Sequence, residues 1–161
     1  MRTTAGVCVL LALLFAPLAE ARKPRSTVRA HLVGNVNDGE VFSSQFVSPT
    51  TGRNVVIQKA PTLSEQDVVA FSAYPAPDGS YGVLFTLNEH GKLALDTLSI
   101  EKRGTFLYVL VNGKLVAELQ IDRRVSDGKL YVASGLSAAD IALMKRDWPP
   151  ATTKSRRADN R

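Results

Sequence analysis

The sequence predicts an α+β domain with a mostly antiparallel sheet and two or three short helices packed on one face. Segments rich in β-branched and aromatic residues are joined by short Asn-Gly and Asp-Gly turns, which are typical of antiparallel strands. Two Ser-x-x-Asp patterns before apolar residues indicate helix starts. With 161 residues, 45% of them hydrophobic, the chain can form one domain with a sizeable core.

The N-terminus is typical of a secretory signal peptide spanning residues 1–21. Arg2 precedes an apolar run from Val7 to Ala16 that is shorter than the roughly 20 residues of a membrane-spanning helix. Ala19 and Ala21 are the small residues that a signal peptidase requires. Cleavage would remove Cys8, the single cysteine, and leave a chain without disulfides. We therefore expect an exported protein, periplasmic or secreted, with an uncleaved N-terminal anchor as the alternative.

The net charge of +5 lies in the two ends of the chain. Residues 22–29 form a basic arm, and residues 149–161 form a basic tail that we expect to be disordered. Residues 30–150 contain 11 basic and 13 acidic residues, so the body is slightly acidic. A nucleic-acid-binding domain would instead gather basic residues on its folded face. We expect no nucleic-acid partner and at most peripheral membrane contact through the basic ends.

The first half of the body predicts three extended segments. They span residues 27–36, 41–47 and 54–59, with turn residues at Asn37-Asp38-Gly39 and at Pro49 to Gly52. The turn residues at 37–39 predict a hairpin between the first two segments.

A helix is predicted to begin at Ser64. Its hydroxyl can cap the first turn, and Asp67 can answer it in a capping box. We expect this helix to run to about Ala73 and to end before Pro75.

The second half predicts strand, helix, hairpin, strand and helix. A strand over residues 81–87 precedes a helix that Asn88 can cap and that runs to about Arg103. Asn112-Gly113 joins residues 106–111 and 115–121, and this pair favours a two-residue type I′ hairpin turn. The first arm is apolar on both faces, which predicts a central strand.

A last strand over residues 129–133 leads to the last helix, which Ser137 caps with Asp140 as its partner and which ends near Trp148. The Leu-Ser-x-x-Asp pattern of this helix also begins the helix predicted at Ser64. Two interpretations stay open: an internal duplication of a hairpin–strand–helix unit, or chance recurrence of capping signals.

Few residues carry recognisable chemistry. His31 and His90 lack metal-ligand spacing, and no nucleophile elbow or phosphate-binding loop is present, so no catalytic residue, metal or cofactor is predicted. Glu118, Asp122 and Asp127 could pair as catalytic carboxylates, but any acidic antiparallel sheet offers such pairs.

The order of predicted elements from Tyr81 to Trp148, together with several residues in them, is similar to that of a known protein family. The matching segments are Val83 to Leu87, Gly91-Lys92, Thr97, Gly104, Leu107 to Val109, Asn112 to Val116, Ile121, Gly128 and Ser134 to Asp140. These residues resemble the head part of the first periplasmic domain of SecD, the auxiliary protein-export subunit. The resemblance implies a SecD-head-like fold, a periplasmic-type location and contact with extended polypeptide. It does not imply a translocation role, and it leaves residues 22–80 unassigned.

We therefore expect one domain over residues 30–148 that acts as an exported, non-enzymatic binding module. An open sheet edge that accepts an extended peptide is the expected contact. Two alternatives remain: an accessory component that binds an envelope protein, and an exported hydrolase whose carboxylates are unidentified.

Overall fold

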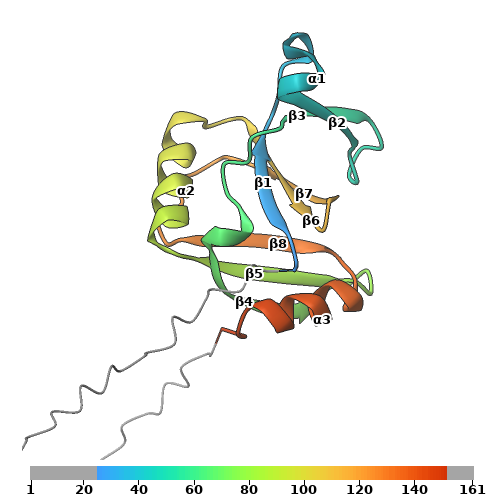
Figure 1. The fold of residues 1–161 in the computed structure, drawn as a ribbon, viewed down its shortest axis with the longest axis vertical. Coiled ribbons are helices and arrows are strands. Elements are labelled where there is room, and N and C mark those ends of the chain that lie inside the picture. Colours follow the sequence, from blue (N-terminus) through green and yellow to red (C-terminus); the bar gives the residue numbers. More distant parts are fainter. Residues whose placement is uncertain (1–24, 152–161) are drawn as a thin grey trace, which may run out of the picture.

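The computed structural model describes residues 25–151, which form a mixed α+β fold (Figure 1). The predicted fold class is confirmed: within these residues all strand pairs are antiparallel, and three short α-helices accompany them. The strands are β1 (Val28–Leu32), β2 (Ser43–Val47), β3 (Asn54–Gln58), β4 (Val68–Pro75), β5 (Tyr81–Leu87), β6 (Phe106–Val111), β7 (Lys114–Gln120) and β8 (Lys129–Leu136). The helices are α1 (Gly39–Phe42), α2 (Glu89–Glu101) and α3 (Ala138–Asp147), with 3-10 turns η1 (Val36–Asp38) and η2 (Glu65–Asp67).

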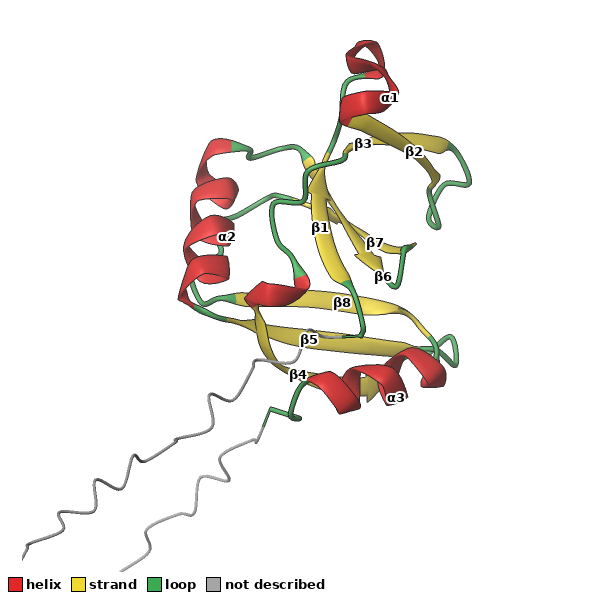
Figure 2. Ribbon diagram, viewed as in Figure 1, coloured by secondary structure: helices red, strands yellow, loops and turns green. Residues whose placement is uncertain are grey.

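The strands form three small sheets, with orders β1-β6-β7, β2-β3 and β4-β5-β8 (Figure 2). Asn112 and Gly113 join β6 to β7 with backbone φ values of 51° and 78°, as a type I′ turn requires. The central strand β6 is buried along nearly its whole length, in keeping with its apolar residues on both faces.

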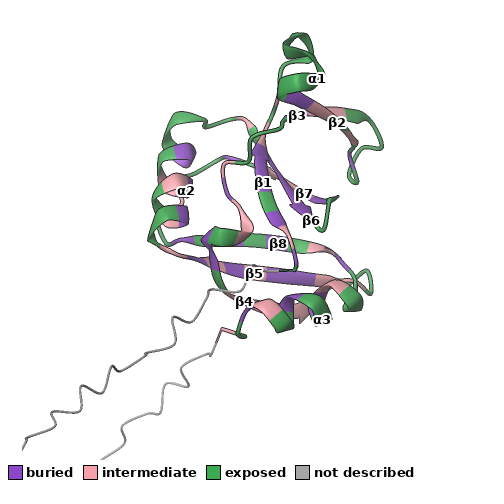
Figure 3. Ribbon diagram, in the orientation of Figure 1, coloured by how far each residue is buried: buried purple, intermediate pink, exposed green. Residues whose placement is uncertain are grey.

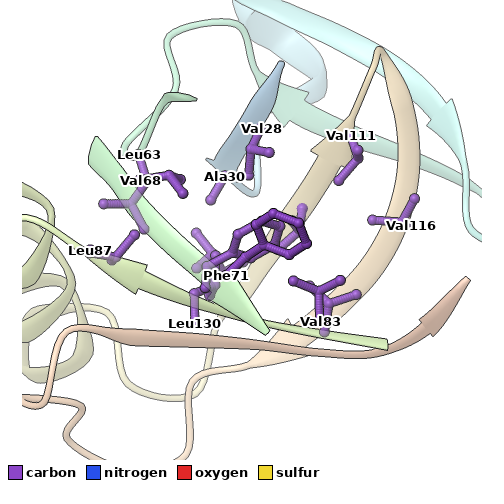
Figure 4. Close-up of a cluster of buried hydrophobic side chains, with 14 of the residues drawn as sticks. Val28, Ala30, Leu63, Val68, Phe71, Val83, Leu87, Val111, Val116 and Leu130 are labelled. Carbon is purple, nitrogen blue, oxygen red and sulfur yellow. The ribbon is translucent and has the colours of Figure 1, made fainter. Parts of the chain in front are cut away.

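The main core lies between the two three-stranded sheets. Figure 4 shows Phe71 of β4 and Leu130 of β8 gathered with Val28 and Ala30 of β1. Helices α2 and α3 contribute buried side chains to the same cluster, and Figure 3 shows the buried stretches of both helices. Burial of this apolar surface is the main stabilising contribution to such a fold.

A second, smaller core lies on the opposite face of the β1-β6-β7 sheet. Ile57 of β3 packs there against Tyr108, Leu110 and Leu115. The β2-β3 hairpin thus covers one side of β6 and forms the base of a lobe, defined here as residues 33–59, that projects from the body (Figure 1).

The helix predicted from Ser64 to Ala73 is wrong. Ser64 and Asp67 do form a capping box, but it closes only η2, and the chain continues as β4. Strand β4 pairs along its length with β5, and a tight turn in which Ala76 N–H bonds Ser80 O joins them. Backbone pairing and burial of Phe71 therefore outweigh the local helix signal.

The predicted hairpin at Asp38-Gly39 is also wrong, because β1 pairs with β6 and residues 36–42 form η1 and α1 instead. The duplication hypothesis fails with it. The first proposed unit contains neither that hairpin nor the helix after Ser64, whereas the second contains both elements.

The fold extends beyond the predicted limits of 30–148. The backbone N–H groups of Arg25 and Ser26 both donate to one carboxylate oxygen of Asp147, at 2.9 and 2.7 Å. At the other end, Ala151 N–H donates to Phe71 O at 2.8 Å. Residues 25–29 of the predicted basic arm and residues 149–151 of the predicted basic tail therefore contact the domain. The predicted signal peptide, with Ala19 and Ala21, lies outside the described residues.

Candidate functional site

A groove of about 550 Å³ lies between the end of β7 and the start of β8. Residues 121–127, in the connection between these strands, form one wall, and α2 also lines the groove. Leu95, Leu98, Leu107 and Leu130 form the apolar floor. The rim is polar and carries charges of both signs. An apolar interior of this volume with a polar margin is usual for sites that bind small molecules or short peptide segments.

The 121–128 connection is fixed against α2 by side chains. Ser99 is buried, and its hydroxyl accepts a hydrogen bond of 2.9 Å from Val125 N–H while donating to Asp96 O. Arg124 makes two bonds of 2.6 and 2.8 Å to the Asp96 carboxylate, and these bonds lower the pKa of Asp96. The groove wall is therefore preformed.

Two sheet edges meet at the groove. Strand β7 ends the β1-β6-β7 sheet and β8 ends the β4-β5-β8 sheet. The two strands approach closely at Val116 and Gly135, where a methyl group on Gly135 would lie 3.1 Å from Val116 O. Further along the two strands, residues 119–121 and 129–131 both line the groove.

A third sheet edge already holds an extended segment. Pro150 forms a parallel bridge with Phe71 on the outer side of β4, next to the hydrogen bond from Ala151 N–H. The edges of this sheet therefore accept extended backbone in at least one observed case.

Of the predicted cap and turn residues, Ser64 and Asp67 lie at η2, where Asp67 contacts His90 of α2. The other four, Asn112, Gly113, Ser137 and Asp140, lie together near the start of α3, away from the groove. Ser137 and Asp140 form a capping box at the start of α3, with Asp140 N–H bonding the Ser137 hydroxyl at 3.2 Å. The Asn112 side chain bonds Asp140 at 2.8 Å and accepts from Thr27 N–H at 3.1 Å. These residues join the hairpin, α3 and β1, a structural role.

Both histidines have protein partners. His31 is buried, and its Nδ1–H donates to Gln58 O at 2.7 Å; burial lowers its pKa. His90 Nδ1 lies 2.7 Å from an Asp67 carboxylate oxygen. Among residues 25–151, no group of three or more His, Cys, Asp or Glu side chains is placed to hold a metal ion.

Two of the three candidate carboxylates lie in the groove. Asp122 and Asp127 line it but are exposed, and Asp127 accepts the backbone N–H of Lys129 at 3.1 Å. Glu118 instead lies opposite Tyr108 in the β6–β7 register. Sequence reasoning did not find the groove, because its walls come from α2, β7 and β8, which only the fold brings together.

No protein-family model matches this sequence, and neither does any curated protein. Solved structures do resemble the fold. One, described as a membrane component SecDF that enhances protein export, shares 16% identity with a TM-score of 0.54, over 78% of this chain and 64% of that one. Another, SecDF in its super-membrane-facing form, shares 16% identity with a TM-score of 0.53, over 78% of this chain and 19% of that one.

The chain thus spans about 64% of the length of the first of these structures. The similar region covers 78% of this chain, so it includes residues before Tyr81 and is wider than the sequence resemblance indicated. Within residues 25–151, no helix is long and apolar enough to cross a membrane. At this identity the likeness concerns the fold, and it confirms that the described chain has a SecD/SecDF-like fold.

Proposed function

We propose that this protein is a non-enzymatic module that binds exported polypeptide in an extended conformation. The groove between β7 and β8 is the proposed binding site. The observation that carries the proposal is the meeting of two terminal strands over one apolar floor.

The chemistry of the groove supports this assignment over a small polar ligand. An extended peptide bonds to a sheet edge through its backbone, which is independent of sequence, while alternate side chains enter pockets. The apolar floor would take those side chains, and the polar rim would leave the neighbouring side chains in water. The parallel bridge of Pro150 with Phe71 is a precedent within the same molecule.

The structural likeness gives the proposal its biological setting. The similar SecDF structure is described as that of a membrane component that enhances protein export. We propose for this chain a corresponding location outside the cytoplasm, periplasmic or secreted, where unfolded exported polypeptide would be the partner.

Binding to a permanently unfolded protein, reduced and carboxymethylated, tests the proposal. Leu119→Glu and Tyr131→Glu place charges in the groove, and each is expected to weaken binding at least about tenfold. Leu143→Glu on α3 is the matched control, since Leu143 is exposed outside the groove residues. The native form of the same probe protein should not bind.

Two results would contradict the proposal. Equal binding by groove and control variants, with unchanged unfolding curves, would remove the groove as the site. Crosslinking in cells that recovers one stoichiometric envelope protein and no exported chains would favour the accessory-component alternative.

A further inference from the structure

The end of the lobe exposes apolar side chains. Val36 of η1 and Val41 and Phe42 of α1 are 73%, 75% and 68% exposed, which is unusual for neighbouring large hydrophobic residues. Helix α1 lies at the end of the lobe, far from the strands of the body (Figures 1 and 3).

Hydrogen bonds hold these side chains outward. Asp38 N–H donates to Asn35 O at 3.1 Å, and Ser43 N–H and its hydroxyl both donate to Gly39 O. Lys59 N–H donates to Phe42 O at 2.8 Å and ties α1 to the end of β3. The exposed tip is therefore part of a defined turn, anchored through the β2-β3 hairpin to the second core.

The size and shape of the tip limit what can cover it. Three side chains on a projecting turn offer a few hundred Å² at most, well below the roughly 800 Å² that each partner buries in a stable protein interface. The apolar region of a lipid bilayer is deformable, so it can surround a projecting tip without presenting a complementary surface.

Charge gives the second constraint. The lobe contains two acidic residues, Asp38 and Glu40, and two basic residues, Arg53 and Lys59, so its net charge is zero. Asp38 and Glu40 lie in the tip itself, and Lys59, which donates to Glu40 O, is the basic residue beside them, whereas Arg53 lies in the β2–β3 turn at the other end of the hairpin. The tip thus has no electrostatic attraction to an anionic surface, and a zwitterionic surface does not repel it. Removal of the apolar side chains from water is therefore the main driving force for binding at the tip.

We propose that Val36, Val41 and Phe42 insert into the interfacial region of a lipid bilayer, so that the lobe makes peripheral membrane contact. This contact differs from the one expected from the basic ends of the chain, because it depends on buried apolar area rather than on attraction to anionic lipid. It is independent of polypeptide binding in the groove.

Flotation with lipid vesicles tests the proposal on the full chain. We expect tip-dependent binding to phosphatidylcholine that is no stronger when phosphatidylglycerol is mixed in, and this tip-dependent part should not fall as salt rises. The double variant Val41→Ser with Phe42→Ser should lower the partition coefficient at least about tenfold. Leu93→Ser with Ile100→Ser, two exposed positions on α2, is the matched control and should bind normally.

A fluorescence measurement locates the tip directly. Phe42→Trp should shift to the blue on vesicles and be quenched by brominated acyl chains, whereas Leu93→Trp should not. The native Trp148 is buried and gives a constant background.

Binding only to anionic vesicles, abolished by salt and equal in both double variants, would overturn the proposal in favour of the basic ends. A concentration-dependent dimer that Phe42→Ser abolishes, with no vesicle binding, would also overturn it.

Discussion

The Tyr74 hydroxyl donates a hydrogen bond of 2.7 Å to Val132 O, reaching from β4 across the middle strand β5 to β8. The Tyr74 ring stacks on Tyr131, with 5.7 Å between centroids and an interplanar angle of 7°. Burial, together with the Tyr131 hydroxyl, raises the pKa of Tyr74, which therefore stays protonated as a donor. Gly82 lies beneath this contact and makes it possible.

Gly82→Ala should destabilise the protein by about 3 kcal/mol or more, because a methyl group there would overlap both the Tyr74 ring and Ala133 O. Chemical denaturation measures the loss. Tyr74→Phe is the control, which removes only the hydroxyl and should cost about 1 kcal/mol. Equal small losses in both variants would show that the sheet adjusts to the added methyl.

Asp147→Asn should reduce the dependence of stability on acid. Burial would raise the pKa of Asp147, but the N–H groups of Ser26 and Arg25 outweigh it and hold the pKa below its ordinary value of 3.8. The charged form therefore stabilises the fold at neutral pH, and that contribution is lost as pH falls through the lowered pKa. The free energies of unfolding of the wild type and of Asp147→Asn should differ most at about pH 6 and should converge as the pH falls to about 2. A difference that grows toward acid would refute the assignment.

Ser99→Ala should loosen the wall of the groove more than Arg124→Ala does. Ser99 is buried, and its hydroxyl is the acceptor of the Val125 N–H group. Ser99→Ala removes this acceptor and should lower the free energy of unfolding by about 1–2 kcal/mol. Arg124→Ala breaks an exposed ion pair, which solvent screens. Hydrogen exchange at the Val125 amide should accelerate clearly in Ser99→Ala. The ranking fails if Arg124→Ala exchanges faster there.

Asn112 and Gly113 stabilise the β6–β7 turn in different ways. Gly113→Ala places a side chain at φ 78° and should cost about 1 kcal/mol through backbone strain alone. Asn112→Gly keeps the turn conformation but removes the bonds to Thr27 and Asp140, and should cost a similar amount. The two variants should differ in where the structure is loosened, because only Asn112→Gly should increase hydrogen exchange at the start of β1.

Local patterns predicted those elements whose partners lie nearby in sequence. The β6–β7 hairpin at Asn112-Gly113 and the helix after Ser137 are explained by turn and capping chemistry. The same capping pattern at Ser64 does not produce a helix, because β4 finds a hydrogen-bonding partner in β5 one turn away. A capping box therefore specifies a turn, and tertiary pairing decides whether the chain continues from it as a helix or as a strand.

Distant pairings could not be predicted from local patterns. Strand β1 pairs with β6, so that Ala30 lies opposite Val109, and no short-range signal joins segments so far apart. The groove depends on such distant contacts, since residues of α2, β7 and β8 line it together. The apolar tip of the lobe could not be predicted from the sequence either. The sequence pattern places Val41 and Phe42 in a strand, where alternate side chains would be covered, whereas both residues lie in α1.

The hydrogen bonds from Arg25 and Ser26 to Asp147 have a topological consequence. They bring the first described strand beside the last helix, so the chain enters and leaves the domain at one place. Domains with adjacent termini can be carried as insertions in a loop of a host protein without stretching either partner, and they tolerate circular permutation. The same architecture is thus suited to work as a separate unit or as one segment of a longer polypeptide.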